Sequence, residues 1–232
     1  MENTNYPQIK EVIRLKGIRK TIAQRMRASL NTAAQAMHVI EIDLSRVMDL
    51  HKELKDEGKK ISITDILIKA TALSLRETPL LNSTIEENEI SVYEDINIAL
   101  AIAIENGLVT PVIRCADKKS LAQISEAVKD MTFRAKAGQL TLDDFTGGTF
   151  TVSNLGMYGI DQFTAIINPP QSGILAISAA KKRVVVTEGD QMEIKPVMKV
   201  TLTYDHRVLD GAPAAQFLGR LKDICENRIN KE

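Results

Sequence analysis

Hydrophobic residues recur three or four positions apart in several stretches of the chain, which is the spacing of an amphipathic helix. The spacing and the capping residues together predict helices over residues 19–34, 45–57, 64–78 and 120–137. A last helix is expected to carry Phe217, Leu218, Leu221, Ile224 and Cys225 on one face. We expect Ser45 to cap the second of these helices, which ends before Gly58, and Pro79 to stop the third.

Alternation of hydrophobic and polar residues marks the strands. Residues 37–45, MHVIEIDLS, alternate in this way and predict a strand with one buried face. Further strands are expected within residues 96–114, 149–153, 173–180 and 197–205. Asn106-Gly107 and Glu188-Gly189-Asp190 are turn sequences and predict two β-hairpins. Together these elements predict an α+β fold, a two-layer sandwich with a mixed β-sheet.

Composition narrows the possible functions. The 232 residues include 30 Lys and Arg and 30 Asp and Glu, so the formal net charge is zero. A nucleic-acid-binding protein needs a basic surface, and this balance argues against that function. No apolar stretch reaches the roughly 20 residues of a membrane span. Two cysteines, Cys115 and Cys225, cannot supply a disulfide framework or four zinc ligands. We therefore expect a cytoplasmic chain with reduced thiols that binds neither nucleic acid nor membrane.

A single domain accounts for most of the chain. Helical and strand patterns follow one another from Leu15 onwards without an internal repeat or a low-complexity linker. We therefore assign residues 15–232 to one domain and residues 1–14 to an N-terminal arm. An arm of this kind packs on a partner surface or stays disordered. The first residues contain no apolar segment of a signal peptide.

The sequence DHRVLDG at residues 205–211 is the first candidate for chemistry. It lies where the last strand meets the last helix, and such a junction exposes side chains. Histidine is the side chain best suited to act as a general base at neutral pH. Asp205, Arg207 and Asp210 could fix the tautomer of His206 and the backbone around it. The same pattern also fits a plain strand-to-helix turn with Asp205 as a cap.

The sequence TFTVSNLGMYG at residues 149–159 is the second candidate. A strand delivers Ser153 and Asn154 into a loop that contains Gly156 and Gly159. Glycines allow a ligand to approach the backbone closely, and a serine hydroxyl can donate a hydrogen bond to a developing oxyanion. The alternative is a glycine-rich bend with a turn serine. The Gly-x-Ser-x-Gly motif of hydrolases is not present here, so a serine nucleophile has little support.

Residues 17–27, GIRKTIAQRMR, place a basic face on the first predicted helix. Such a face could meet the phosphates of a ligand, or it could simply be solvated. The remaining histidines, His38 and His51, fall on a strand and on an exposed helix, and we assign neither of them to a ligand.

These segments together resemble the dihydrolipoamide acyltransferases, the core components of 2-oxo acid dehydrogenase complexes. The resemblance rests on DHRxxDG at residues 205–211, NGLVTPVIR at 106–114 and TGGTFTVSNLG at 146–156. It extends from Gly17-Ile18-Arg19-Lys20 to the last helix and so covers nearly the whole chain. Chloramphenicol acetyltransferase is similar in fold but usually has a second histidine where Asp205 stands, which favours the acyltransferase core.

The resemblance implies a chloramphenicol acetyltransferase-like fold and acyl transfer between a dihydrolipoyl thiol and coenzyme A. It also implies that His206 deprotonates the attacking thiol and that Ser153 donates a hydrogen bond to the tetrahedral oxyanion. Asp210 would hold the local structure of the motif through an ion pair to an arginine. A thiol with a pKa of about 8.5 is mostly protonated at neutral pH, so a positioned base accelerates its attack. No metal is required.

Residues 153–160 and 163–171 look most like acetyl-transferring members, which serve pyruvate or acetoin dehydrogenase complexes. A succinyl or branched-chain substrate is the alternative. The family implies a homotrimer, a larger cage, and work with lipoyl domains and with the dehydrogenase and dihydrolipoamide dehydrogenase components. Lipoyl and subunit-binding domains are not found in the sequence, which indicates a catalytic core alone. A non-catalytic scaffold and a small-molecule acetyltransferase are the other hypotheses, although intact His206, Ser153 and Asp210 argue against a scaffold.

Overall fold

The computed structural model of the chain describes residues 7–105, 107–187 and 189–229. The α-helices within these residues are α1 (Gly17–Thr32), α2 (Ser45–Asp56), α3 (Ile63–Leu75), α4 (Leu121–Lys136) and α5 (Gly211–Asp223). Short 3-10 turns are η1 (Pro79–Leu81), η2 (Asp143–Phe145) and η3 (Gly156–Tyr158), and a π-helical turn, η4 (Ile224–Arg228), continues α5. The strands are β1 (Gln35–Asp43), β2 (Ser83–Glu86), β3 (Glu89–Val92), β4 (Ile98–Leu100), β5 (Ile102–Ile104), β6 (Gly107–Val109), β7 (Val112–Ile113), β8 (Phe150–Asn154), β9 (Gly173–Ile177), β10 (Lys181–Thr187) and β11 (Gln191–Asp205).

The main sheet is mixed. Its strands follow the order β1-β11-β9-β8-β4-β7, and β10 pairs with the first part of β11. Strand β8 runs parallel to both β4 and β9, whereas the other neighbours are antiparallel. The pairs β2–β3 and β5–β6 form separate two-stranded ribbons.

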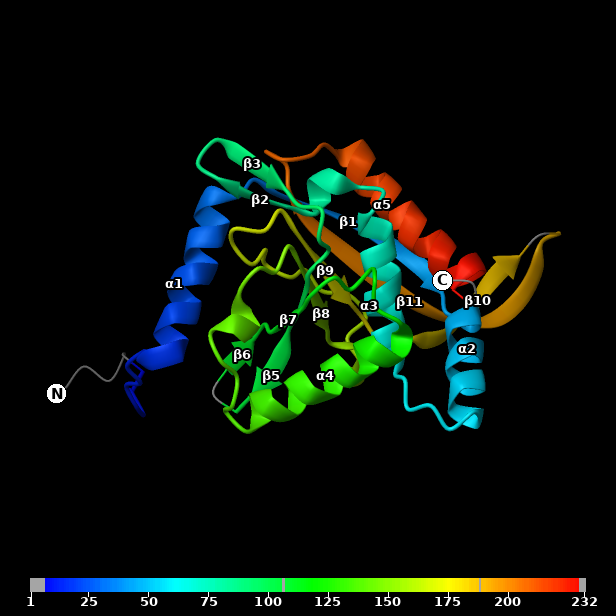
Figure 1. Cartoon of the computed structure of the whole chain (residues 1–232), viewed down its shortest axis with the longest axis horizontal. Coiled ribbons are helices and arrows are strands. Elements are labelled where there is room, and N and C mark those ends of the chain that lie inside the picture. Colours follow the sequence, from blue (N-terminus) through cyan, green and yellow to red (C-terminus); the bar gives the residue numbers. More distant parts are fainter. Residues whose placement is uncertain (1–6, 106, 188, 230–232) are drawn as a thin grey trace.

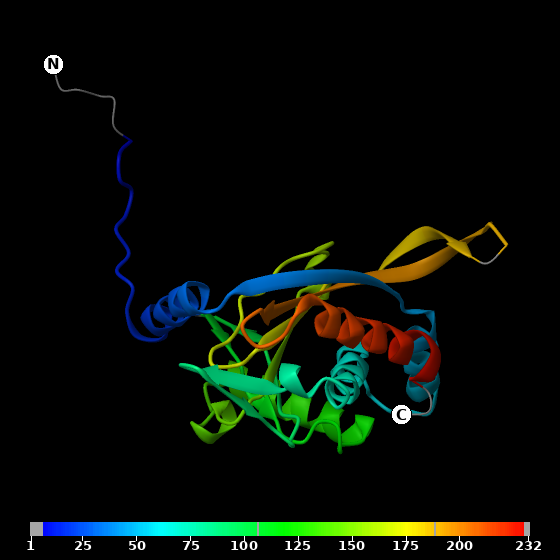
Figure 2. The ribbon, with the colours of Figure 1, turned by 90° about the horizontal axis from the view of Figure 1, so that it is seen from above.

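The helices α2 to α5 cover one face of this sheet, while α1 stands outside the layer (Figures 1 and 2). Helix α3 packs against α2, α4 and α5, and α5 packs against β1 and β11. The core between the layers is apolar, and the rings of Phe150 on β8 and Phe217 on α5 lie 5.9 Å apart in it. The two-layer α+β sandwich with a mixed sheet is therefore confirmed.

Helix α3 begins with a reciprocal cap. The Ser62 hydroxyl accepts from the Asp65 N–H at 3.2 Å, and the Asp65 carboxylate accepts from the Ser62 N–H at 2.7 Å, which satisfies two N–H groups that the helix itself cannot pair. The helix ends at Leu75, before Pro79 is reached. The expectation that Pro79 stops this helix is wrong, because the proline opens the separate turn η1 instead.

The start of α2 also differs from expectation. Ser45 is the first helical residue, and its N–H and hydroxyl donate to Asp43 Oδ1 at 2.8 and 2.6 Å. The capping acceptor is therefore the carboxylate of Asp43 at the end of β1, and the assignment of that role to Ser45 is wrong. An ionised carboxylate only accepts hydrogen bonds, so it accepts two hydrogen bonds from one residue more readily than a hydroxyl does.

Two segments project from opposite ends of the molecule (Figure 2). Residues 7–16 run outward from the start of α1, and the β10–β11 hairpin runs outward at the other end. This hairpin and the β5–β6 hairpin confirm the two predicted β-hairpins. Asn106, Glu188 and residues 1–6 of the expected arm lie outside the described residues. Within the described ranges, no helix is long and apolar enough to cross a membrane.

Candidate active site

His206 follows the last residue of β11 directly. Its N–H donates to the carbonyl of Ala34 at 2.8 Å, next to the pairing of Gln35 with Asp205 that starts the β1–β11 ladder. The backbone of His206 is therefore fixed to the sheet, while 48% of its side chain remains exposed. A histidine held in this way is accessible to a substrate without being mobile at its Cα.

The buried carboxylate of Asp205 organises the residues around His206. It accepts hydrogen bonds from the N–H of Ala34 at 3.2 Å and from the N–H of Arg207 at 3.0 Å. The Arg207 guanidinium also binds it through Nε at 3.0 Å and Nη2 at 2.6 Å. Burial raises the pKa of Asp205, but the hydrogen bonds from Arg207 and Ala34 outweigh burial and leave the pKa below its ordinary value. Asp205 and Arg207 therefore fix the backbone that carries His206.

Asp210 precedes α5 and stands beside His206. Its Oδ1 lies 3.7 Å from His206 Nδ1, and 88% of its side chain is exposed. The distance is longer than a hydrogen bond, so the carboxylate lies beside the imidazole without bonding to it. The expected arginine partner of Asp210 is not found among the residues that the structure describes.

One ring beside His206, that of Tyr204, was not singled out from the sequence. Tyr204 is buried, and its ring centroid lies 5.7 Å from that of His206 and 5.3 Å from that of His38. Burial, helped by the charge of Asp210, raises the pKa of Tyr204, so its phenol stays neutral. In the sequence, Tyr204 looks like one more inward-facing residue of an alternating strand, and no local signal marks it as part of a site.

Ser153 lies near the end of β8 with a half-buried side chain. The next residue, Asn154, holds the loop: its Nδ2 donates to Thr64 Oγ1 at 2.9 Å, and its Oδ1 accepts from the Gly156 N–H at 2.8 Å. A Cβ on Gly156 would stand 3.0 Å from both Asn154 Oδ1 and the Ser178 carbonyl. Gly156 therefore makes room for the chain's own loop, rather than for the ligand that the sequence suggested.

The register of the sheet separates Ser153 from His206 within one chain. Ser153 pairs with Ala176 on β9, and Ala176 pairs with Thr201 on β11. His206 is five residues further along the chain than Thr201 and two strands away from Ser153. At about 3.3 Å per residue and about 4.8 Å between strands, these offsets amount to roughly 19 Å. One chain alone does not bring the two predicted catalytic residues together.

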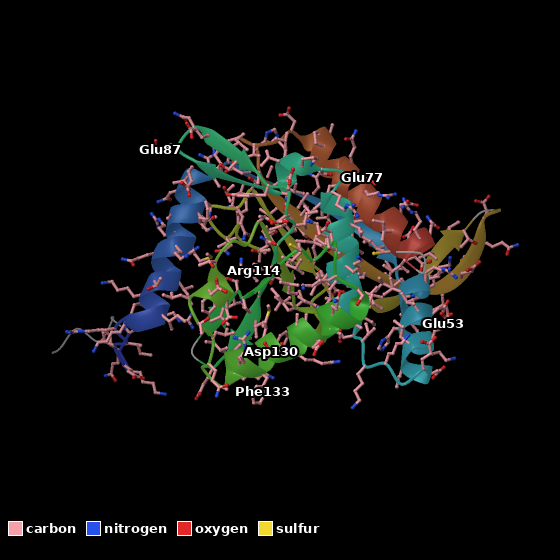
Figure 3. The ribbon with its side chains drawn as sticks, viewed as in Figure 1. Glu53, Glu77, Glu87, Arg114, Asp130 and Phe133 are labelled. Carbon is pink, nitrogen blue, oxygen red and sulfur yellow. The ribbon has the colours of Figure 1, made fainter. Side chains whose placement is uncertain are left out.

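Arg114, which is labelled in Figure 3, links one sequence motif to the segment that precedes another. It closes the motif at residues 106–114, and its Nη2 donates to the carbonyl and the carboxylate of Asp143 at 3.1 and 3.0 Å. Asp143 lies just before the motif at residues 146–156, whose strand β8 pairs with β4, and β4 pairs in turn with β7 of the motif at residues 106–114. These two motifs therefore form one structural unit that supports the strand of Ser153.

The basic face of α1 is partly used within the chain. Arg25 donates through Nη2 to Asn168 Oδ1 at 3.2 Å and to the Pro169 carbonyl at 2.8 Å. The Ser29 hydroxyl donates to the Ile167 carbonyl at 2.7 Å. Helix α1 therefore holds residues 167–169 in place, and the hydrogen bonds of Arg25 stabilise the fold.

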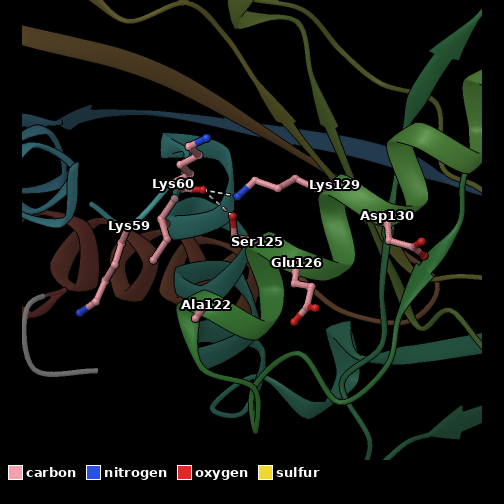
Figure 4. A pocket seen from close by; sticks show the side chains of 8 residues that line it. Lys59, Lys60, Ala122, Ser125, Glu126, Lys129 and Asp130 are labelled. Carbon is pink, nitrogen blue, oxygen red and sulfur yellow. Dashed lines mark hydrogen bonds between the residues drawn. The ribbon is translucent and has the colours of Figure 1, made fainter. Parts of the chain in front are cut away.

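A groove of about 430 Å³ lies between residues 59–61 and α4 (Figure 4). Its charged lining consists of Lys59, Lys60, Glu126, Lys129 and Asp130. The Ser125 hydroxyl and the Lys129 ammonium both donate to the Lys60 carbonyl. Neither His206 nor Ser153 lines this groove, so it is separate from the candidate active site.

Comparison with known proteins identifies the family. Residues 7–230 match the model of the 2-oxoacid dehydrogenases acyltransferase catalytic domain. The chain is 42% identical over 215 residues to the dihydrolipoyllysine-residue acetyltransferase component of the pyruvate dehydrogenase complex of Rickettsia bellii, covering 90% of this chain and 51% of that protein. It is 41% identical over 220 residues to the succinyltransferase component of the 2-oxoglutarate dehydrogenase complex of Rickettsia typhi, covering 93% and 55%. The chain spans about half the length of these relatives, and it belongs to the 2-oxoacid dehydrogenase acyltransferase family.

Solved structures agree with this assignment. A probable dihydrolipoamide acetyltransferase from Listeria monocytogenes has a TM-score of 0.91 at 34% identity, over 96% of this chain and 97% of that chain. The dihydrolipoamide acetyltransferase of Azotobacter vinelandii, investigated for the role of a serine, a histidine and an asparagine in its catalytic mechanism, has a TM-score of 0.90 at 29% identity, over 98% and 95%. A chloramphenicol acetyltransferase matches at 0.56 and 16% identity, over 94% and 100%. The expected chloramphenicol acetyltransferase-like fold is therefore confirmed.

Proposed function

We propose that this chain transfers an acyl group between a dihydrolipoyl thiol and coenzyme A. The observation that carries the proposal is His206, half-exposed at a strand end whose backbone is fixed by Asp205 and Arg207. Thiols are largely protonated at neutral pH, and an accessible imidazole beside a carboxylate is the group that removes such a proton. Membership of an acyltransferase family supports the same reaction.

The reaction needs two groups from the protein. His206 takes the proton of the attacking thiol, and the sulfur forms a bond to the carbonyl carbon of the thioester. Ser153 donates a hydrogen bond to the oxyanion of the tetrahedral intermediate. The intermediate collapses with loss of the second sulfur, which recovers the proton from His206. A serine and a histidine were also investigated in the Azotobacter relative, which supports this choice of residue types.

Each active site draws on two chains in this proposal. Ser153 and His206 lie roughly 19 Å apart in one chain, too far for a single oxyanion site. His206 of one copy faces Ser153 of the next copy. A cyclic trimer has head-to-tail interfaces, which create this pairing at every boundary between chains.

Acetyl is the acyl group that we propose. Residues 153–160 and 163–171 support it, because they resemble acetyl-transferring members of the family. The relatives themselves include an acetyltransferase at 42% identity and a succinyltransferase at 41%. Comparing kcat/KM for acetyl-CoA and succinyl-CoA tests this choice, and a preference for succinyl-CoA would reverse it.

The proposed working form is a homotrimer within a larger hollow cage. The cubic core of a pyruvate dehydrogenase multienzyme complex, with a TM-score of 0.88 and 29% identity over 98% of this chain, supports this assembly. A lipoyl domain would present the dihydrolipoyl thiol, and the dehydrogenase and dihydrolipoamide dehydrogenase components would load and reoxidise the lipoyl group. Light scattering that reports only a monomer near 25.7 kDa would refute the trimer.

Acyl transfer from acetyl-CoA to free dihydrolipoamide is the direct test. The expected result is formation of S-acetyldihydrolipoamide with release of CoA thiol, measured by chromatography and by thiol titration. A chain that assembles but transfers nothing to dihydrolipoamide would be a scaffold. Transfer to chloramphenicol-like alcohols in preference to dihydrolipoamide would instead indicate a small-molecule acetyltransferase.

A further inference from the structure

Three rings lie in a row beside the candidate active site. His38 pairs with Leu202, two residues before Tyr204 on β11, and His206 follows two residues after Tyr204, so the two imidazoles flank the Tyr204 ring along the strand. The His38 ring meets the Tyr204 ring edge-on, with centroids 5.3 Å apart at 69°. The His206 ring lies 5.7 Å from the Tyr204 ring at 40°. Tyr204 therefore connects His206 to His38.

The Tyr204 ring is closely confined. It is only 1% exposed, and helix α5 packs on the two strands, β1 and β11, that carry the three rings. A Cβ on Gly211, the first residue of α5, would stand 3.7 Å from the Tyr204 hydroxyl and 3.5 Å from His38 Nε2. The start of α5 therefore lies against both the phenol and the His38 ring and limits their movement.

A hydrogen bond holds the phenol end of this ring. The Tyr204 hydroxyl lies 3.5 Å from His38 Nδ1. Burial, together with the charge of Asp210, raises the pKa of Tyr204, so the phenol keeps its proton and can donate a hydrogen bond. His38 accepts at Nδ1 when its own proton is on Nε2. A buried tyrosine hydroxyl usually requires a partner of this kind, and the half-buried His38 supplies it.

The imidazole of His206 depends on packing for its orientation. Asp210 Oδ1 lies 3.7 Å from Nδ1, beyond hydrogen-bond distance, and no hydrogen bond to this ring is formed in the part of the chain that the structure describes. The Tyr204 ring is its buried neighbour. Because Nδ1 lies toward Asp210, Nε2 is the nitrogen left to take a proton from a thiol. Loosening the Tyr204 ring would let the imidazole leave this orientation.

We propose that Tyr204 is a positioning residue, which keeps the His206 imidazole oriented for proton transfer at Nε2, and that His38 holds Tyr204 in place. This inference rests on the proposed function, in which His206 removes the proton of the attacking thiol. In this role neither Tyr204 nor His38 binds substrate. Misplacing a reacting group by about 1 Å can lower a rate by about 10²-fold, so residues behind the base contribute to kcat and leave KM unchanged.

Removal of the phenol hydroxyl tests the role of Tyr204. Tyr204→Phe keeps the ring and should lower kcat roughly tenfold, less than the effect of a full 1 Å misplacement, with unchanged KM for CoA and dihydrolipoamide. His38→Leu should have the same effect, whereas His38→Asn keeps an acceptor near the position of Nδ1 and should restore most of the activity. Tyr93→Phe is the matched control: the Tyr93 hydroxyl bonds Thr84 of the separate β2–β3 ribbon at 2.9 Å, and its loss should leave kcat unchanged.

The double variant Tyr204→Phe with His38→Leu distinguishes one shared hydrogen bond from two independent effects. Both substitutions remove the same bond, so the double variant should match either single variant, whereas independent effects would multiply to roughly 10²-fold. Light scattering and circular dichroism check that each variant is assembled and folded. If His38→Leu does not assemble, the kcat of Tyr204→Phe decides the question.

Three results would overturn the positioning role: an unchanged kcat in Tyr204→Phe, a multiplied effect in the double variant, or a raised KM at constant kcat, which would assign Tyr204 to substrate binding. An active His206→Ala enzyme would instead remove the base from the proposed function. The failure of this inference and the failure of the proposed function are therefore distinct.

Discussion

At the scale of single residues, the Asp205 carboxylate makes more of the hydrogen bonds around the candidate site than His206 does. It ties the N–H of Ala34 before β1 to the N–H and guanidinium of Arg207 after β11. His206 lies between these fixed points and makes its own backbone bond to Ala34. The imidazole position therefore depends on a neighbour that is itself buried.

His206→Ala should lower kcat by roughly 10²–10⁴-fold, the range expected for loss of a general base. The fold should survive, because the side chain is half-exposed at a strand end. Steady-state kinetics with acetyl-CoA and dihydrolipoamide measure the effect, with circular dichroism as the control for folding. Near wild-type turnover in this variant would remove His206 from the mechanism.

Ser153→Ala should cost about 2.7–4 kcal/mol of transition-state stabilisation with little change in the KM for CoA. The hydroxyl is expected to bind the oxyanion, which exists only during the reaction. The measurement separates kcat from KM over a range of CoA concentrations. A large rise in KM at constant kcat would reassign Ser153 to ground-state binding.

Asp205→Asn should lower the free energy of unfolding by roughly 2–4 kcal/mol at pH 7, because it breaks a buried ion pair with Arg207. Hydrogen bonds hold the pKa of Asp205 below its ordinary value, so its ionised form stabilises the fold above that value. This contribution is complete at neutral pH and is lost as the pH falls through the lowered folded-state pKa.

Urea unfolding from pH 7 to pH 3 checks this sign. The difference between the wild type and Asp205→Asn should shrink below about pH 4, the ordinary value for an aspartate. Asp210→Asn is the matched control, because Asp210 is exposed and its replacement should change the unfolding free energy by less than about 0.5 kcal/mol. A difference that stays constant over this pH range would contradict the assignment.

At the scale of elements, β11 links the two ends of the molecule. It pairs with β1, β9 and β10, carries Tyr204 and Asp205 at one end and leads into the projecting hairpin at the other. Strand β8 does not pair with β11, because β9 lies between them in the sheet. The loop after β8 is positioned by the side chain of Asn154, which accepts from the Gly156 N–H within the loop and donates to Thr64 on α3.

Gly156→Ala should destabilise the fold by roughly 1–3 kcal/mol, because the new Cβ would crowd the Ser178 carbonyl, which is backbone and cannot move aside. Activity should fall as well, since the loop adjoins Ser153. Gly219→Ala in α5 is the matched control: its Cβ would meet nothing within 4 Å, and the helix should gain about 0.5–1 kcal/mol. Thermal unfolding of both variants provides the comparison, and equal shifts in Tm would contradict it.

At the scale of the whole molecule, the sheet register separates the two predicted catalytic residues, so the proposed activity requires an assembly. The two predicted catalytic residues stand at opposite ends of the sheet, roughly 19 Å apart by strand geometry. A single chain can therefore fold completely and still lack a complete site. In the proposed trimer, each boundary between neighbouring chains would supply what one chain lacks.

Mixing two inactive variants tests this arrangement. When His206→Ala and Ser153→Ala chains are unfolded and refolded together in equal amounts, a site is intact only if it takes His206 from one variant and Ser153 from the other. Random assembly makes about a quarter of the sites intact in a head-to-tail ring. Recovery near a quarter of wild-type activity is the expected result. No recovery, with mixed trimers seen by mass spectrometry, would place both residues of a site in one chain.

The sequence by itself determined most of the elements, though not β2 and β3, and the residue types of the candidate site. Helix α4 beginning after Ser120, the two hairpins and a strand ending at Asp205 all follow from spacing and turn residues, which act over a few positions. Only the tertiary structure decided that the Arg207 guanidinium binds the Asp205 carboxylate and that the Tyr204 ring lies against His206. It also decided that Ser153 and His206 lie apart, because strand order and register join residues distant in sequence, and no local pattern records them.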